Sequence, residues 1–538
     1  MRGAVVAPQP IAASEGINVL KRGGNAVDAA ITAALVQGVV DPHMAGIGGF
    51  GDMLIYIQDQ GEPIEISFHG RVGSRATPEV FAPYVIEQIR GHAERYLVKD
   101  YINQIGYKSV AVPGTIMGFY EAQSQFGTYD WADVFQPAIR YCKEGFPLPG
   151  EVYDRWRQVE KHGHVPGLKR LAATPASAAI YLKNGDLYPP GAIIVNPDYG
   201  RTLEKIAKEG PEVFYKGDIA ETIADDFQKN GGFITREDLA DYKLMIDRPL
   251  RGTYRDFHVF SAHPPSSGVQ LIQLLNILEG LDLRSMGHLS PRYIHHVARA
   301  MQISFADRAT FMGDPEFVDV PVMRWISKEY ADECRQRVQS GETIVVPKIK
   351  PRESGSTTHL CTMDGKGNAV TLTHTLGSAS GVVTPGLGFT YNNCMYQFHP
   401  MPGHPNSIQP GKRRITGTTP TMFFRGNKPW MVAGGPGGTR ILTVVMHTFI
   451  NVAEFGLSAF EAVSAPRFQC EGEDIEMESR LYFLVREELE AMGWKLYPSA
   501  YALDNGFARA YTIIDRGDGK GLEGGADPRA GGCTAILR

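Results

Sequence analysis

The chain has 538 residues, of which 43% are hydrophobic, and a formal net charge of −5 at pH 7. This length suffices for one large layered domain with insertions, or for more than one domain of average size. The weak negative charge and the absence of a basic run argue against a nucleic-acid partner. No apolar stretch approaches the roughly 20 residues that a membrane-spanning helix needs, so we expect no membrane contact either.

The N-terminal stretch MRGAVVAPQPIAASEG lacks the apolar core of a signal peptide. The six cysteines are scattered and none forms a CxxC pair, which favours reduced thiols over disulfides or a zinc site. Both observations favour a cytoplasmic protein. A periplasmic or secreted location stays open if a leader peptide has been removed.

The first half of the chain predicts several helices. Residues 10–39 predict two helices, with Gly23 and Gly24 ending the first and Asn25 capping the second. The glycine-rich MAGIGGFG runs into the apolar strand DMLIYI, and PGTIMGFYEAQSQFG predicts a helix between a proline and a glycine. Residues 200–245 predict amphipathic outer helices, and PPSSG precedes another helix of period near 3.6.

The predicted secondary structure changes from mainly helices to mainly strands after a polar connector at residues 341–356. TTHLCTM, DGKGN and AVTLTHTL predict strand, turn and strand, with Thr371, Thr373 and Thr375 on one face. PTMFF, PWMVAGG and ARAYTIID predict further strands, and ILTVVMHTFINVAEFG a long apolar helix. Successive strands that pair as hairpins, mixed with helices, favour antiparallel sheets covered by helices.

The stretch ESGSTTHLCTMD, residues 353–364, places two threonines where a loop becomes a strand. Threonine is common in strands, and that alone accounts for the pair. A second interpretation is a concealed nucleophile. A threonine hydroxyl needs a base, and a threonine at a new N-terminus carries one in its own α-amine, whose reference pKa is near 8.

Several motifs together favour the second interpretation. GGNAVDAAI, NGGFITREDLADYK, PPSSG, DRATFMGDP, ESGSTTHLCTMDGKGNAVTLTHTLG, QPGKRR, GGPGGTR, APRF and GADPR occur in this order. Over nearly its whole length the chain resembles the γ-glutamyltranspeptidase family of N-terminal-nucleophile hydrolases. The resemblance implies an α+β fold, a four-layer αββα sandwich of two antiparallel sheets flanked by helices. It also implies a proenzyme cleaved between Ser356 and Thr357 into a large subunit, 1–356, and a small subunit, 357–538.

The resemblance also implies catalytic roles. Thr357 would be the nucleophile, Thr375 would hydrogen-bond it, and the backbone N–H groups of Gly437 and Gly438 would hold the oxyanion. Taken alone, GPGG is equally an ordinary tight turn and Thr375 an ordinary strand residue. We expect no dinucleotide cofactor, because GIGGFG fits GxGxxG only loosely and precedes its strand. We expect no metal, because His359 and His374 lack a third ligand at suitable spacing.

The γ-glutamyl pocket departs from the family pattern. The family arginine that grips the substrate carboxylate aligns with His69, and Arg71 lies two residues on. The family glutamine and aspartate that hold the α-ammonium align with Cys394 and Gln397 in NNCMYQF. Two residues beyond Thr375, where the family has an asparagine or a glutamate, this chain has Gly377. The aligned substrate-binding positions are His69, Arg71, Gly377, Asn393, Cys394, Gln397, Thr416 and Gly417.

A site without these charged groups gains nothing from the zwitterionic head of glutamate. The leading hypothesis is therefore a self-processing amidohydrolase for a small-molecule amide with a non-glutamyl acyl group, such as a glutaryl amide. Its acyl group would carry a carboxylate if Arg71 or Arg413 faces the pocket. A true γ-glutamyltransferase or glutathione hydrolase with rearranged contacts stays open. So do an uncleaved, silent homologue that serves as a binding protein, and a homo-oligomer.

Overall fold

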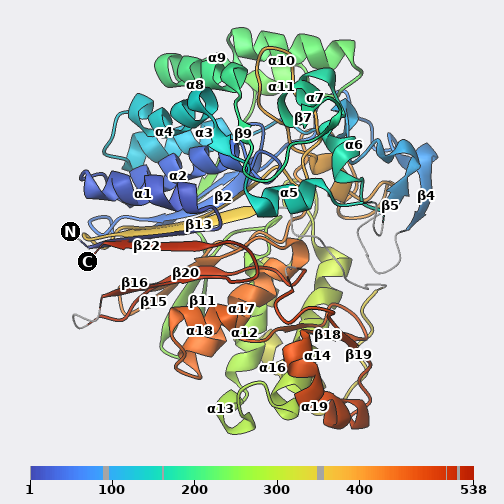
Figure 1. The fold of residues 1–538 in the computed structure, drawn as a ribbon. Coiled ribbons are helices and arrows are strands. Elements are labelled where there is room, and N and C mark those ends of the chain that lie inside the picture. Colours follow the sequence, from blue (N-terminus) through green and yellow to red (C-terminus); the bar gives the residue numbers. More distant parts are fainter. Residues whose placement is uncertain are drawn as a thin grey trace.

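The computed structural model describes residues 2–88, 96–159, 163–347, 357–504, 506–517 and 521–537. Within these residues two β-sheets lie face to face, and helices cover the outer side of each sheet (Figure 1). This four-layer αββα arrangement confirms the predicted fold. No helix in this part of the chain is both long and apolar enough to cross a bilayer.

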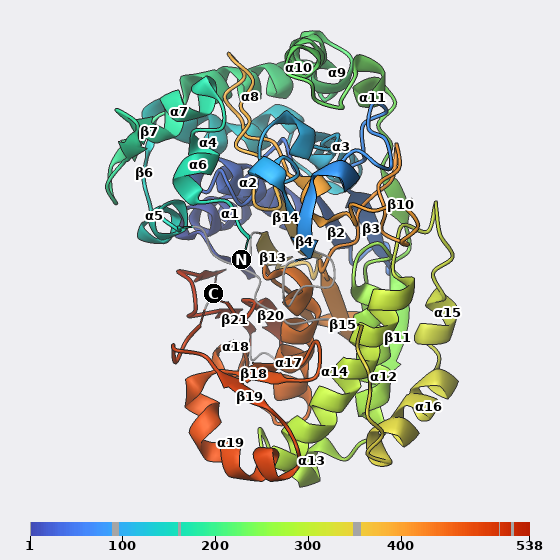
Figure 2. The ribbon, with the colours of Figure 1, turned by 90° about the vertical axis from the view of Figure 1, so that its right-hand side faces the viewer.

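The first sheet has seven strands, all paired antiparallel. In spatial order they are β10 (Met245–Asp247), β3 (Pro63–Phe68), β2 (Phe50–Tyr56), β14 (Ala369–Thr375), β13 (Thr358–Asp364), β1 (Gly3–Ala7) and β22 (Cys533–Leu537). Strands from both ends of the sequence therefore share one sheet. Because β1 pairs with β22, the two ends of the chain lie close together (Figure 2).

The second sheet has six strands, also antiparallel. They are β11 (Leu250–Tyr254), β12 (Phe257–Ser261), β15 (Thr421–Arg425), β16 (Lys428–Gly434), β20 (Tyr511–Asp515) and β21 (Leu522–Ala526). The remaining strands are short: β4 (Val85–Gln88), β5 (Tyr96–Val98), β6 (Phe146–Pro147), β7 (Leu182–Lys183), β8 (Asp186–Leu187), β9 (Ile193–Ile194), β17 (Phe468–Gln469), β18 (Ile475–Met477) and β19 (Leu496–Pro498).

Helices from the first half of the chain cover the first sheet (Figure 1). They are α1 (Pro10–Lys21), α2 (Ala26–Val40), α3 (Thr115–Phe126), α4 (Trp131–Glu144), α5 (Gly150–Trp156), α6 (Gly167–Leu171), α7 (Pro175–Tyr181), α8 (Pro197–Glu209), α9 (Glu212–Tyr215), α10 (Asp218–Lys229) and α11 (Arg236–Ala240).

The helices on the second sheet are α12 (Gly268–Glu279), α13 (Leu283–Met286), α14 (Pro291–Phe311), α15 (Val322–Trp325), α16 (Lys328–Gln339), α17 (Ile441–Ala453), α18 (Ala459–Ser464) and α19 (Ser479–Ala491).

The predicted break between the first two helices is confirmed. The side chain of Asn25 accepts from the backbone N–H groups of Val27 and Asp28, and the Asp28 carboxylate accepts from the N–H of Asn25 at 2.7 Å. This reciprocal capping box satisfies the free N–H groups at the start of α2. Every residue of α2 is buried, because the helix lies between α1, α4 and the first sheet.

The register of β13 and β14 separates their side chains onto two faces. Thr358 pairs with His374 and Cys361 with Thr371. Leu360 and Leu372 pack into the helix-side core, while Cys361 packs into the core between the sheets. Because successive residues of a strand alternate between faces, odd-numbered residues of both strands face the second sheet. The predicted common face of Thr371, Thr373 and Thr375 is confirmed, and Thr357 is brought opposite Thr375.

Candidate active site

Thr357 immediately precedes β13 and is 7% exposed. Its hydroxyl donates to the Thr375 hydroxyl over an Oγ1–Oγ1 distance of 3.2 Å. The Thr375 oxygen also accepts from the backbone N–H of Gly377 at 2.8 Å. The two predicted threonines are therefore brought together at the end of the sheet. Ser356, the other side of the predicted cleavage site, lies outside the described residues.

Gly377 occupies a tight turn beside Asn393. Its φ is +70°, and an added Cβ would lie 2.3 Å from Asn393 Oδ1. That oxygen accepts from the N–H of Ser378 at 2.8 Å, and the Asn393 amide donates to the carbonyl of Gln104 at 3.0 Å. The asparagine thus fastens the turn, and the turn leaves no room for a larger side chain at position 377.

The predicted oxyanion glycines form a sharp turn after β16. Gly437 has φ +151° and Gly438 has φ +61°, a region that favours glycine. An added Cβ on Gly437 would lie 2.1 Å from the Cβ of Ala508, and one on Gly417 would lie 1.8 Å from the carbonyl oxygen of Gly438. Glycine at position 417 is therefore required by close backbone approach.

Contacts between β13 and β16 show where this turn lies relative to the start of β13. On β13, the Cys361 thiol contacts the carbonyl of Val432 on β16. Two residues nearer Thr357, the ring of His359 lies against Gly434, where an added Cβ would be 2.2 Å from Cε1. The two strands thus advance together, residue pair by residue pair. The turn after Gly434 therefore begins at the end of β16 that lies beside the start of β13.

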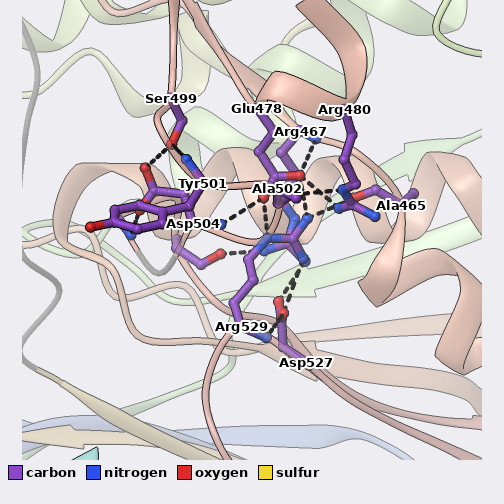
Figure 3. Close-up of polar contacts among 12 residues, drawn as sticks. Ala465, Arg467, Glu478, Arg480, Ser499, Tyr501, Ala502, Asp504, Asp527 and Arg529 are labelled. Carbon is purple, nitrogen blue, oxygen red and sulfur yellow. Dashed lines mark hydrogen bonds and ion pairs between the residues drawn. The ribbon is translucent and has the colours of Figure 1, made fainter.

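A buried cluster of charges, whose polar contacts Figure 3 shows, lies next to the glycine turn. Arg529 makes two contacts of 2.6 and 2.8 Å with the Glu478 carboxylate and one of 3.0 Å with Asp527. Arg467 pairs with Asp527 at 2.6 Å and donates to the carbonyl of Ala508, the residue packed on Gly437. Burial alone would raise the pKa of Asp527, but Arg467 and Arg529 outweigh it and hold that pKa below its usual range.

In the sequence, these residues stand out only as parts of motifs. Arg467 belongs to APRF, and Asp527 and Arg529 belong to GADPR. The motifs could mark these residues as important. The role of each residue depends on contacts with residues far apart in the chain, which the motifs do not show.

His69 belongs to a second buried network, with Asp52, Ser266 and Thr418. The Nε2 atom of His69 lies 3.1 Å from Asp52 Oδ2 and 2.9 Å from Ser266 Oγ. The same Asp52 oxygen accepts from Ser266 at 2.6 Å and from Thr418 at 2.7 Å. Burial would raise the pKa of Asp52, but the charge on His69 and these hydrogen bonds lower it to about 2. Asp52, Ser266 and Thr418 were not singled out from the sequence, although Ser266 lies in PPSSG.

The two arginines considered for a substrate carboxylate are both paired within the protein. Arg71 holds Glu316 through two contacts of 2.9 and 3.0 Å, and also donates to the carbonyl of Gly411. Arg413 holds Asp314 at 2.5 and 3.1 Å and approaches Glu316 at 3.2 Å. These carboxylates neutralise both guanidinium groups. A substrate carboxylate at either arginine would therefore compete with a carboxylate of the protein.

The remaining aligned positions carry no negative charge. Cys394 is buried between Phe50 and Ala111, and burial raises the pKa of its thiol to about 11 despite nearby Arg414. Gln397 is half-buried, and its backbone carbonyl accepts from the Asn406 amide at 2.7 Å.

Thr416, His359 and His374 all have hydrogen-bond partners within the protein. Thr416 is buried, and its carbonyl accepts from the Ser267 hydroxyl at 2.8 Å. His359 contacts Thr373 at 2.8 Å and His374 contacts Gln37 at 2.8 Å. Among the described residues, no group of three or more His, Cys, Asp or Glu side chains is placed to hold a metal ion.

Comparison with known proteins agrees with this geometry. The profile of the family described as gamma-glutamyltranspeptidase matches residues 12–537. The chain belongs to the γ-glutamyltranspeptidase family. It is 37% identical over 502 residues to the acylase ACY 1 proenzyme of Pseudomonas sp. strain SE83, covering 93% of this chain and 88% of that protein. It is 34% identical over 549 residues to the glutathione hydrolase proenzyme of Escherichia coli K12, with coverage of 98% and 90%.

A solved structure extends this likeness to three dimensions. The cephalosporin acylase of Bacillus halodurans superposes with a TM-score of 0.87 and 28% identity, over 99% of this chain and 95% of that one. Like these relatives, this member of the γ-glutamyltranspeptidase family is an enzyme of the N-terminal-nucleophile hydrolase class. The resemblance read from the motifs is thereby confirmed.

The Asp52 network yields a stability prediction. Asp52→Asn removes the charge that His69, Ser266 and Thr418 share and turns one acceptor into a donor. We expect the free energy of unfolding to fall by about 3 kcal/mol, as for a buried pair that loses one partner. Urea unfolding at pH 7, followed by circular dichroism, measures this. Asp256→Asn, which breaks an exposed pair with Arg425, is the control and should change stability by less than about 0.5 kcal/mol. Equal small losses in both variants would contradict the prediction.

Proposed function

We propose that this chain is a self-processing amidohydrolase in which Thr357 attacks an amide carbonyl and water resolves the acyl-enzyme. The observation that carries the proposal is the pair of hydroxyls at the end of the sheet, with Thr357 donating to Thr375 at 3.2 Å. Acyl transfer needs a nucleophilic hydroxyl and preorganised donors for the oxyanion, and Thr357 and the glycine turn are the proposed sources of these. Membership of the γ-glutamyltranspeptidase family supports it.

Maturation would cut the chain between Ser356 and Thr357. The subunits would be residues 1–356 and 357–538, and the α-amine freed on Thr357 would serve as the base. The topology supports an intertwined product. In the first sheet, β13 lies between β14 and β1, and β1 lies between β13 and β22. Strand β1 of the large subunit therefore lies between two strands of the small subunit, and β14 of the small subunit pairs with β2 of the large one, so the ladder hydrogen bonds would hold the subunits together.

The oxyanion would be held by the backbone N–H groups of Gly437 and Gly438. Glycine is required here because the turn packs directly on Ala508 and Gly417. The charge cluster around Arg529 and Asp527 fixes the segment beneath the turn, and preorganised donors of this kind lower the barrier without moving during the reaction.

The acyl group of the substrate would lack an α-ammonium. The positions that would hold an ammonium are Cys394, with a thiol pKa of about 11, and Gln397, and neither carries a negative charge. His69, Asn393 and Thr416 would contact the acyl group, whereas Gly377 and Gly417 contribute only backbone. Arg71 and Arg413 are paired with Glu316 and Asp314, so we do not assign them a substrate carboxylate. A glutaryl-type or other non-glutamyl amide therefore fits better than a γ-glutamyl one.

The nucleophile is tested by maturation. Thr357→Ala should give one full-length band on a denaturing gel, because alanine has no oxygen for the N→O acyl shift that precedes cleavage. Thr357→Ser should still process. Thr358→Ala is the matched control, because the Thr358 hydroxyl faces Gln9 on the helix side and its loss should leave two bands. Two subunits from Thr357→Ala would show that cleavage is external or lies elsewhere.

The proposed oxyanion hole is tested by adding a side chain at Gly437. Gly437→Ala should lower kcat for anilide hydrolysis by about 10²–10³-fold, because its Cβ collides with Ala508 and displaces the donor. Combining it with Ala508→Gly should restore little of the rate, because the added Cβ would still lie 2.5 Å from the backbone Cα of residue 508. Ala508→Gly alone is the control and should keep most activity. Normal turnover in Gly437→Ala, with the fold checked by circular dichroism, would move the oxyanion hole elsewhere.

Specificity is tested with two substrates that differ only in the α-ammonium. Glutaryl-p-nitroanilide should be cleaved at least as well as γ-glutamyl-p-nitroanilide, because an ammonium buried without a counter-ion costs a few kcal/mol, and about 1.4 kcal/mol is tenfold in kcat/KM. Gln397→Asp, alone or with Cys394→Gln, should move the preference toward the γ-glutamyl compound. A strong wild-type preference for γ-glutamyl-p-nitroanilide would favour a glutathione hydrolase with rearranged contacts.

A further inference from the structure

A cavity of about 270 Å³ lies beside the candidate active site, lined by residues of α5, of α6 and of the segment between β21 and β22. Four arginines line it: Arg155, Arg170, Arg509 and Arg529. Two acidic residues, Glu151 and Asp154, stand on its wall. We call this cavity the arginine pocket. Its lining is more basic than a chain of net charge −5 would lead one to expect.

The arginine pocket adjoins both halves of the candidate site. Ser378 lines it and directly follows Gly377, whose N–H is bonded to the Thr375 hydroxyl. Arg509 also lines it, and the backbone N–H of Arg509 donates to the carbonyl of Pro436 in the glycine turn at 2.9 Å. A substrate whose carbonyl lies at Thr357 could therefore place another group in this pocket.

Two of the arginines already have carboxylate partners. Arg155 pairs with Asp41 at 2.6 Å, and Arg529 pairs with Glu478 and Asp527. Asp154, on the wall, pairs with the exposed Arg157 at 2.8 Å. These charges are balanced within the protein.

Arg170 differs from them. It is 7% exposed and donates only to backbone carbonyls, those of Ala379 and Gln104. Within the described part of the chain, no carboxylate forms an ion pair with its guanidinium. Burial lowers the pKa of Arg170 to about 10, so it is still charged at pH 7. A buried cation without a counter-ion is costly unless an anion binds beside it.

Uncharged hydrogen-bonding groups share the same cavity. His43 and Trp156 both line it and are buried, and their rings meet edge to face at 5.5 Å. Neither ring nitrogen of His43, nor the indole nitrogen of Trp156, has a hydrogen-bond partner among the described residues. Buried polar atoms of this kind are normally satisfied. Their clustering with Arg170 indicates a site built for an anion with several acceptor oxygens.

We propose that the arginine pocket binds a carboxylate of the amide substrate, with Arg170 as its counter-ion and His43 and Trp156 as hydrogen-bonding partners. The inference rests on the proposed amidohydrolase function and names its substrate class: amides that carry a second, anionic group. The carboxylate can belong to the acyl group or to the leaving group. Arg170 would thus bind the substrate carboxylate, whereas Arg71 and Arg413 are already paired with carboxylates of the protein.

Two pairs of substrates distinguish these sources on processed wild-type enzyme. Glutaryl-p-nitroanilide and its methyl ester differ in the acyl carboxylate. The glutaryl amides of 4-aminobenzoate and of 4-aminobenzamide differ in a carboxylate on the leaving group. We expect kcat/KM to favour the carboxylate in one pair by about tenfold or more, which corresponds to about 1.4 kcal/mol. No preference in either pair would overturn the proposal.

Variants then assign the preference to Arg170. Arg170→Met should abolish it, whereas Arg170→Lys, which keeps the charge, should retain part of it. Arg157→Met removes an exposed positive charge next to the pocket that does not line it, and should leave the preference intact. If Arg170→Met fails to process, the decisive variant is His43→Phe, which keeps the ring packing and should lower the preference at least about threefold. A preference unchanged in the decisive variant would overturn the assignment.

The outcome is separable from that of the proposed function. If the chain is no amidohydrolase, no anilide is cleaved and no subunits form. If only the arginine pocket is misassigned, the enzyme matures and cleaves anilides without a carboxylate preference that depends on Arg170.

Discussion

The pairing of β13 between β14 and β1 is the constraint on which the candidate site depends. It sets Thr358 opposite His374, and so brings Thr357 and Thr375 together on the face toward the second sheet. Because side chains alternate along a strand, a slip of one residue would turn Thr357 toward α2 and remove it from the glycine turn. The slip would also turn Leu360 out of the helix-side core and Cys361 out of the core between the sheets. Packing on both faces therefore fixes the position of the hydroxyl.

Two buried charge networks hold the loops around this strand pair. One joins Asp52 of β2 to His69, Ser266 and Thr418, and thereby ties the first sheet to loops of the second. The other joins Arg529, Asp527, Glu478 and Arg467 beneath Ala508 and the glycine turn. Each charge in these networks has its partner in place, which is the condition for burying it at tolerable cost. The segments they fix include His69, Thr418 next to Gly417, and Ala508 next to Gly437, so the networks hold predicted site residues in place.

Some arginines near the candidate site are paired within the protein, and one is available to bind a substrate anion. Arg71 and Arg413 lie near the aligned glutamyl pocket but are neutralised by Glu316 and Asp314. Arg170 lines the arginine pocket together with Ser378, and its hydrogen bonds go to the backbone carbonyls of Gln104 and Ala379. Sequence alignment points to the first two, because they are close to the family motif. Electrostatics points to the third, because a guanidinium attracts a substrate anion only where its charge is not already compensated.

The sequence by itself determined the local features of this protein. The alternation of AVTLTHT predicts the shared face of Thr371, Thr373 and Thr375, and the sequence around Asn25 predicts the helix boundary, because both depend on residues a few positions apart. The ordered motifs identified the family and its αββα fold. Only the tertiary structure decided which arginines are paired, since Arg71 meets Glu316 across 245 positions and Arg413 meets Asp314 across 99. It also decided why positions 377 and 417 are glycine, and where Arg170 lies, because close approach and charge compensation arise between segments that no local pattern connects.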